Sequence, residues 1–312
     1  MAKNEQIILV TGASSGIGAA IADRLAADGH QVFGTGRGAS GVRPSGVEML
    51  PLDVGSDPSV RTCVDAVVAR AGRIDVLVNN AGQLLAGAIE DATMAQVKAV
   101  FETNFFGVAR MVAAVLPGMR EARAGKIINI SSLAGLVPVP FWGFYNASKF
   151  AVEGYSETLR LEVAPFGIRV AMVEPGMIRT ALYARPAPTP VAAYSPWRDR
   201  SFETMKGFED KAPGPEIVAA RVSRIVAQKN PRLRNRLTRE ATIFPFLRWL
   251  LPARAYEAGI RSGFNLDKGR RPKHRLGPDL ANVPRSVSAA SNASWVRSCD
   301  RSASRVARNA KR

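Results

Sequence analysis

The sequence predicts a doubly wound parallel α/β fold over residues 1–267, with one sheet covered by helices on both faces. Short runs rich in Val and Ile recur without polar alternation, which is typical of strands buried on both faces of a parallel sheet. Longer segments with helical spacing of apolar residues separate these runs. A glycine-rich turn directly follows the first run. This alternation from the first residues onward indicates a single three-layer α/β/α domain.

Six apolar runs mark the expected strands in chain order. They span residues 7–10, 31–35, 47–54, 74–79, 126–131 and 170–175. The expected helices span residues 17–28, 59–71, 96–120, 145–163 and 215–228. A basic segment at 232–238 fits a final edge strand, and 243–264 has a partly apolar helical pattern. A helix between successive strands lets those strands run parallel in one sheet.

Two segments depart from this alternation. Residues 183–215 are rich in Pro and aromatic residues and show no sustained period, so we expect a loop that acts as a substrate lid. In residues 268–312 large apolar side chains are scarce, which predicts a disordered basic tail. This tail holds 12 Lys/Arg against 2 Asp and therefore carries +10 of the net charge of +17.

Composition excludes several classes of protein. The chain of 312 residues is 46% hydrophobic and can bury a substantial core. Only Cys63 and Cys299 are present, with no CxxC motif or Cys/His cluster, so we expect neither a disulfide framework nor a metal site. The first residues lack the pattern of a secretory signal, and no uninterrupted apolar run approaches the roughly 20 residues that span a bilayer. A cytoplasmic protein without a transmembrane segment is expected.

The first strand leads into a turn that is suited to a dinucleotide. Glycines there let the backbone approach a pyrophosphate, while the following helix N-terminus supplies N–H donors and a positive dipole. Because a strand precedes the turn and a helix follows it, the motif is more specific than a glycine-rich turn alone. The residues expected to contact the cofactor here are Gly12, Ser14, Ser15, Gly16, Ile17 and Gly18.

The end of the second strand indicates which dinucleotide is bound. An acidic residue at this place would bind the ribose 2′-hydroxyl and repel a 2′-phosphate, whereas Arg37 offers the phosphate charge-assisted hydrogen bonds. NADP(H) is therefore favoured over NAD(H), although Arg37 could also be a solvated surface residue. Asp53 and Val54, after the third strand, could meet the adenine, or Asp53 could be a turn residue.

A candidate catalytic pair begins the fourth main helix. Tyr145 and Lys149 are four residues apart, so the phenol and the ammonium share one helix face. A nearby cation stabilises phenolate and lowers the pKa of a tyrosine. Ser132 follows the strand that ends at 131, at the edge where open α/β sheets bind ligands. Each feature alone is common, but the combination is specific to chemistry on an oxygen atom.

These motifs resemble the short-chain dehydrogenase/reductase family, whose members have a Rossmann fold. The matches run in the family's order over roughly residues 5–265: TGASSGIG at 11–18, Asp53, NNAG at 79–82, Asn104, Ser132, YNASK at 145–149, and Pro175-Gly176 followed by Thr180. Residues 148–176 are further similar to members that act on hydroxysteroids and retinol-like alcohols. The resemblance implies an oxidoreductase that interconverts a carbonyl and an alcohol by hydride transfer.

The resemblance also implies a role for each catalytic position. Tyr145 would exchange a proton with the substrate oxygen, and Ser132 would orient that oxygen. Lys149 would hold the nicotinamide ribose and lower the pKa of Tyr145. Asn104 would position a water between Lys149 and solvent, or would kink its helix by bonding the backbone. The family's further cofactor contacts correspond to Asn80, Ala81, Gly82, Pro175, Gly176, Ile178 and Thr180, besides Tyr145 and Lys149.

The expected partners follow from the same segments. Apolar residues at 133–144 and the lid aromatics Tyr183, Tyr194, Trp197 and Phe202 favour a small lipophilic alcohol or ketone, unless they only pack the loop. We expect a homo-oligomer, dimer or tetramer, no specific nucleic acid, and at most weak contact of the tail with an anionic surface. A non-catalytic NADP(H)-binding regulator is the alternative, against which the complete Ser132, Tyr145 and Lys149 set argues.

Overall fold

The computed structural model describes residues 5–180 and 190–267, and within them it confirms the doubly wound parallel sheet. Seven strands are all parallel, in the order β3-β2-β1-β4-β5-β6-β7. Their bounds are β1 Ile7–Val10, β2 Gln31–Gly36, β3 Glu48–Pro51, β4 Val76–Asn79, β5 Gly125–Ile130, β6 Ile168–Pro175 and β7 Arg234–Leu237. The basic segment expected as an edge strand is β7, hydrogen-bonded to β6.

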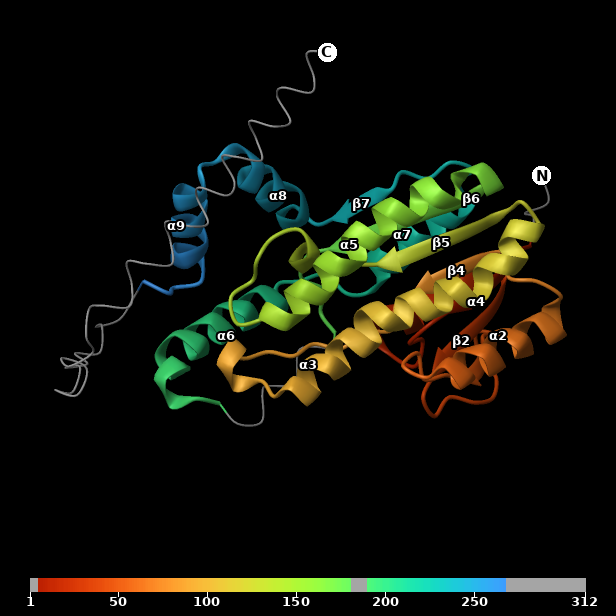
Figure 1. Cartoon of the computed structure of the whole chain (residues 1–312), viewed down its shortest axis with the longest axis horizontal. Coiled ribbons are helices and arrows are strands. Elements are labelled where there is room, and N and C mark those ends of the chain that lie inside the picture. The colour runs from red at the N-terminus through yellow and green to blue at the C-terminus, as the bar shows by residue number, and fades with distance from the viewer. Residues whose placement is uncertain (1–4, 181–189, 268–312) are drawn as a thin grey trace, which may run out of the picture. The chain divides into compact units, whose positions relative to one another are not determined.

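Helices cover both faces of the sheet, as Figure 1 shows. The helices α2 (Asp57–Ala71), α4 (Gly107–Glu121) and α5 (Gly143–Val163) bury one apolar cluster with the strands. On the opposite face, α1 (Gly16–Ala27) and α7 (Glu216–Ala227) bury a second. The three-layer prediction is therefore confirmed. Single turns of 3-10 helix complete the connections at Ile89–Asp91, Leu133–Gly135 and Ala164–Phe166.

The long helix expected at 96–120 has a short wide turn in its middle. α3 (Met94–Phe101) and α4 are joined without a break by a π-helical turn at Glu102–Phe106. By length and composition alone, the stretch Met94–Glu121 is apolar enough to cross a membrane. Its side chains Met111 and Met119 are fully buried against the sheet, however, so it is a core helix of the domain.

The prediction of a structureless loop at 183–215 is wrong for its described part, residues 190–215. A 3-10 turn at Ala192–Tyr194 leads into the helix α6 (Ser195–Asp210). Its buried positions are Arg198, Ser201 and Met205, so mostly polar side chains face inward and the apolar period on which a helix prediction depends is missing. Tyr183 lies outside the described residues, as does the tail at 268–312.

The last described segment forms two helices in place of one. α8 (Glu240–Leu250) and α9 (Ala253–Gly263) divide at Leu251-Pro252, where the proline ends the regular pattern. They follow the carboxyl end of β7 and lie at that end of the sheet, away from its strands (Figure 1).

Candidate active site

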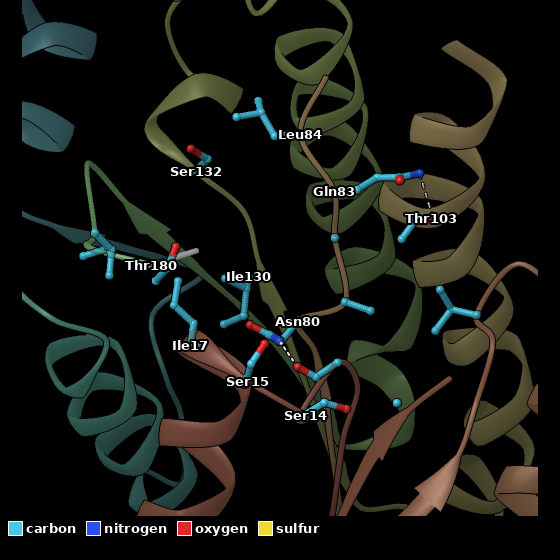
Figure 2. A pocket seen from close by; sticks show the side chains of 18 of the residues that line it. Ser14, Ser15, Ile17, Asn80, Gln83, Leu84, Thr103, Ile130, Ser132 and Thr180 are labelled. Carbon is cyan, nitrogen blue, oxygen red and sulfur yellow. Dashed lines mark hydrogen bonds between the residues drawn. The ribbon is translucent and has the colours of Figure 1, made fainter. Parts of the chain in front are cut away.

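A cleft of about 440 Å³ opens at the carboxyl ends of the strands. β1 and β4 are neighbours in the sheet although two strands separate them in sequence. The connection after β1 runs toward β2 and the connection after β4 runs toward β5, so a crevice opens between the two connections. All the predicted cofactor residues line this cleft, together with Ser132. Figure 2 shows Ser14 and Ser15 toward one end, Ser132 and Leu84 toward the other, and Asn80 and Ile130 between them. The structure thus brings the two halves of the predicted site together.

The glycine turn leaves room for a ligand because side chains are excluded from it. Gly12 has a φ of +66°, and a β-carbon there would lie 2.8 Å from the Cα of Ala81. A β-carbon on Gly18 would overlap the Gly12 carbonyl oxygen, so the helix packs directly on the turn. Asn80 closes the turn from β4, donating from Nδ2 to the Thr11 and Gly12 carbonyl oxygens at 3.0 and 3.1 Å.

The start of α1 is arranged for an anion. Ser15 is its N-cap in extended conformation, and its side chain makes no capping hydrogen bond to the helix. The first turn holds no acidic residue. The backbone N–H groups and the positive end of the helix dipole therefore face the cleft without an internal counter-charge. These features fit the pyrophosphate of a dinucleotide.

The end of the cleft next to β2 carries a positive charge. Arg37 follows β2, is exposed, lines the cleft and has no ion-pair partner among the described residues. A β-carbon on Gly36 would overlap Ser14 Oγ, so glycine is required for that serine to sit beside the strand end. A guanidinium and a hydroxyl at one strand end are the donors that a 2′-phosphate needs. The residues present therefore fit NADP(H).

Asp53 has both of the features anticipated for it. Its Oδ1 accepts a hydrogen bond from the Gly55 N–H at 2.9 Å, which makes it a turn residue. It also lies exposed in the cleft wall with Val54, because β3 ends at Pro51, earlier than the expected strand. The carboxylate therefore still borders the space where an adenine would lie.

Tyr145 stands in the first turn of α5 with its ring against Trp142. The two ring centroids are 5.7 Å apart at 90°, and Tyr145 is buried. Ser132 comes from the end of β5, and its Oγ accepts from the Ala134 N–H at 3.1 Å. Burial raises the pKa of the Tyr145 phenol to about 12, and a hydrogen bond with Ser132 opposes that rise. The phenol is accordingly protonated at neutral pH.

Lys149 lies one helical turn further along α5. Its Nζ donates to the Ile130 carbonyl oxygen at 2.9 Å and is 5.8 Å from the centroid of the Tyr145 ring. Burial lowers the pKa of the ammonium to about 8, while the Glu153 carboxylate raises it. The expected lowering of the Tyr145 pKa is not seen, because removal of the phenol from water has a larger effect than its hydrogen bond with Ser132.

A buried group of charges lies behind Lys149 that the sequence did not indicate. Glu153 on α5 and Glu174 on β6 both form ion pairs with Arg234 on β7. Burial raises the pKa of Glu174 to about 7, and the nearby Glu153 contributes to that rise. The three residues belong to three different elements, so no local pattern could have joined them.

Asn104 is close to the site but does not line the cleft. It is fully buried in the π-helical turn, where its Nδ2 donates to the Gln83 carbonyl oxygen at 2.9 Å and to Ser148 Oγ at 3.0 Å. Its Oδ1 accepts from the Gln83 N–H at 2.8 Å. These hydrogen bonds agree with the alternative in which Asn104 bonds the backbone within a distorted helix. Gly82 separates it from Lys149, since a β-carbon on Gly82 would be 3.5 Å from Asn104 Oδ1 and 3.9 Å from Lys149 Nζ.

The segment after β6 closes one side of the cleft. Gly176 donates its N–H to the Leu237 carbonyl oxygen at 3.2 Å, and a β-carbon on it would overlap the side chain of Thr238. Ile178 is buried, and Thr180 faces Gly16 across the opening. Figure 2 shows Thr180 and Ile17 on the same side of the cleft.

Apolar side chains surround Tyr145 on the side away from the glycine turn. Phe202 of α6 and Phe141 pack edge to face, with ring centroids 6.3 Å apart, whereas Tyr194 donates to Glu90 Oε2 at 2.8 Å. Trp197 is half-buried. The cluster around Tyr145 consists of Leu84, Ala86, Ala134, Val139, Trp142 and Met205, with Met177, Phe202 and Phe264 against it.

Some residues of the cleft wall were not foreseen. They are Thr35, Leu52, Gln83, Leu84, Thr103, Ile130 and Ser131. Gln83 and Leu84 directly follow the NNAG motif, so continuing the motif by two residues would have found them. Gln83 donates from Nε2 to Thr103 Oγ1 at 3.1 Å, as drawn in Figure 2. Thr103 itself has no motif. Within residues 5–180 and 190–267, no group of three or more His, Cys, Asp or Glu is placed to hold a metal ion.

Known proteins resemble the chain in sequence and in fold. The family model described as short chain dehydrogenase matches residues 6–189. A 3-ketodihydrosphingosine reductase of Bacteroides thetaiotaomicron is 46% identical over 74% of this chain and 87% of its own length. Human retinol dehydrogenase 8 is 36% identical over 75% of this chain and 82% of its own. The crystal structure of a variant of actinorhodin polyketide ketoreductase with NADPH matches with a TM-score of 0.65 at 33% identity, covering 76% of this chain and 97% of that one.

Proposed function

The chain belongs to the short-chain dehydrogenase/reductase family of oxidoreductases, and we propose that it interconverts a ketone and an alcohol on a lipophilic substrate, using NADP(H). The observation that carries the proposal is the meeting of Ser132, Tyr145 and Lys149 in the cleft that also holds the glycine turn. Two hydroxyls and one buried cation converge there beside a site shaped for a dinucleotide.

Each side chain would have a separate part in the reaction. When bound, NADP(H) would supply or accept a hydride at the substrate carbon. Tyr145, protonated because its pKa is about 12, would give its proton to the carbonyl oxygen during reduction. Ser132 would hydrogen-bond the same oxygen and stabilise charge on it. The ammonium of Lys149 would hold the nicotinamide ribose. The Ile130 carbonyl oxygen keeps that ammonium in place by accepting a hydrogen bond from it.

The cofactor preference rests on Arg37. An exposed guanidinium at the end of β2, beside Ser14, would bind a 2′-phosphate that the NAD(H) ribose lacks. The structural similarity to a ketoreductase crystallised with NADPH supports the same choice.

The substrate class follows from the walls near Tyr145. The phenol is enclosed by apolar residues of the turn Leu133–Gly135, the segment 136–142 and α6. A hydrocarbon chain or ring could pack against these apolar side chains without depriving a polar group of its hydrogen bond. The relatives named for 3-ketodihydrosphingosine and for retinol support a lipophilic substrate. A long-chain or polycyclic ketone is the class that we propose.

We further propose that the enzyme is a cytoplasmic homo-oligomer. A groove between α4 and α5 is lined by Val112, Leu116, Tyr155 and Leu159, and the nearby Phe106 is 46% exposed. A second copy of the chain would cover Phe106 and the exposed parts of this groove through an isologous contact.

The test is a panel of ketones, aldehydes and secondary alcohols, followed by the absorbance of the reduced nicotinamide. Long-chain and polycyclic ketones should oxidise NADPH, and Tyr145→Phe should abolish that turnover. An enzyme that binds NADPH but turns over none of the panel would support the regulatory alternative. Sedimentation velocity of the same preparation would give the oligomeric state.

A further inference from the structure

The helix α8 presents its more apolar face to solvent. Ile243, Phe246, Trp249 and Leu250 recur at helical spacing and form what we call the α8 outer face. Their exposed fractions run from 43% for Ile243 to 80% for Trp249. In a helix that packs on a soluble core the apolar stripe faces inward, so this orientation is reversed. A contiguous exposed apolar face of this kind marks an interaction surface.

Contacts on the inward side of α8 explain why the helix keeps its apolar face toward solvent. Ala241 is fully buried against the body. About two helical turns later, Arg248 donates to the Leu136 carbonyl oxygen and stacks over the Phe150 ring, with its guanidinium carbon 5.2 Å from the centroid. Arg248, which is itself exposed, therefore attaches α8 to the domain along one side, while Trp249 faces solvent.

Charges of both signs flank the α8 outer face. Arg239 precedes the helix and Arg254 lies exposed in α9, and the exposed Glu240 and Glu257 lie near them in the sequence. After Asp267 the sequence continues as KGRRPKHR at 268–275, with five Lys/Arg, and the chain as a whole carries a net charge of +17. Aromatic and aliphatic side chains flanked by arginine are the composition of helices that lie in the headgroup region of a bilayer, where anionic lipids attract the basic residues.

The position of α8 and α9 relates this face to the substrate end of the site. Phe264, at the end of α9, packs edge to face on Phe208 of α6 with centroids 6.3 Å apart, and it also contacts the apolar cluster around Tyr145. Leu136, the partner of Arg248, lies in the segment between Ser132 and Tyr145. Both helices thus contact the walls of the cleft opposite to its nucleotide end.

We propose that the α8 outer face docks on the surface of an anionic lipid bilayer, so that a lipophilic ketone reaches Tyr145 from the membrane. The role in substrate delivery rests on the proposed function, but the docking does not. A second copy of the chain is a less suitable occupant, because it carries the same net charge of +17, whereas an anionic bilayer attracts a chain of that charge. The groove between α4 and α5 offers a second copy a separate surface.

The experiment is flotation of the full-length protein with two kinds of vesicle, one of phosphatidylcholine and one of equal parts phosphatidylcholine and phosphatidylglycerol. The protein should float with the mixed vesicles and much less with phosphatidylcholine alone, and added salt should weaken binding. The double variant Phe246→Ser, Trp249→Ser should lower the partition coefficient by about tenfold or more, since both side chains would lie in the interface.

A matched control separates docking from general hydrophobicity. Leu161→Ser removes a side chain that is 77% exposed on α5, close to the 80% of Trp249, and it should leave flotation unchanged. Equal flotation of the wild type and the double variant would overturn the proposal, as would absence of wild-type flotation. A change in oligomeric state in the double variant, without vesicle binding by the wild type, would assign the face to a second copy.

The two proposals fail independently. Reduction of a small water-soluble ketone in vesicle-free buffer tests the chemistry alone, and the double variant should match the wild type there. Against a long-chain ketone carried in the mixed vesicles, the double variant should lose rate about in proportion to its lost binding. Flotation without any ketone reduction would keep the docking and refute the proposed function.

Discussion

Arg198 of the helix α6 lies with its Nη1 atom 3.5 Å from Oδ2 of Asp91, a carboxylate that is fully buried. The same carboxylate accepts hydrogen bonds from the backbone N–H groups of Ala88 and Val191, each at 2.7 Å. Asp91 therefore connects the turn before α3 with Val191, just before α6, and with Arg198 in the first turn of α6. The helix α6 packs on the apolar cluster that contains Tyr145. The contact between Arg198 and Asp91 holds α6 against this apolar wall of the cleft near Tyr145.

Replacing Arg198 with Met should loosen that wall. Asp91 would keep its two backbone hydrogen bonds but lose the cation beside it, which should cost about 2–3 kcal/mol of the free energy of unfolding. KM for a ketone should rise more than kcat falls, because α6 shapes the substrate side and not the proton donor. Urea denaturation and steady-state kinetics measure both. The exposed Arg120→Met is the control, and equal effects of the two variants would contradict the assignment.

The cofactor assignment predicts a reversal at Arg37. Arg37→Asp should weaken NADPH binding about tenfold or more and spare NADH, since it exchanges a charge-assisted contact for repulsion of the 2′-phosphate. Fluorescence titration with each nucleotide gives the ratio of dissociation constants. The same substitution at the exposed Arg61 on α2 should leave the ratio unchanged. A wild-type protein that binds both nucleotides equally would refute the role of Arg37.

The glycine turn predicts opposite effects for two Gly→Ala substitutions. At Gly18 a β-carbon would overlap the Gly12 carbonyl oxygen, so Gly18→Ala should lower both stability and NADPH affinity. At Gly154, within α5, no heavy atom lies within 4 Å of the added carbon, and Gly154→Ala should raise stability by about 0.5–1 kcal/mol. Thermal denaturation with and without NADPH tests this. A tolerated Gly18→Ala with normal NADPH affinity would show that the close packing has no part in binding.

Lys149 predicts the pH dependence of cofactor binding. Because the pKa of its ammonium is lowered to about 8, the side chain is charged below that pH and becomes neutral above it. NADPH affinity should therefore fall as the pH rises from 7 to about 9. Lys149→Met should bind weakly throughout and lose this slope. A wild-type dissociation constant that stays constant across the range would argue against contact between the ammonium and the cofactor.

Tyr145 and Ser132 predict different losses of rate. Tyr145→Phe removes the proton donor and should lower kcat about 10²- to 10⁴-fold at pH 7 with NADPH affinity kept. Ser132→Ala keeps the donor and removes only a hydrogen bond to the oxygen, so its loss should be smaller. Single-turnover absorbance measurements separate these steps from product release. Retained turnover in Tyr145→Phe would identify another residue as the acid.

Local signals in the sequence were enough to predict the fold class and the two ends of the site. One signal is a strand, turn and helix with glycines at 12, 16 and 18, and the other is a tyrosine and a lysine one helical turn apart. Such signals are reliable because φ > 0 and close backbone approach require glycine, and because a spacing of four places side chains on one helix face. The alternation of strands and helices likewise predicted that the sheet is parallel.

Features that depend on contacts between distant segments became evident only in the folded chain. The helix α6 has polar residues on its buried face, so the apolar spacing that predicts a helix is missing from its sequence. The reason for a buried Arg198 is its ion pair with Asp91, which belongs to a distant segment. The direction of the Tyr145 pKa shift required knowledge of its burial, since removal from water outweighs the hydrogen bond with Ser132. The contact of Arg248 with Leu136 fixes which face of α8 points outward. Spacing within one segment carries no information about such partners.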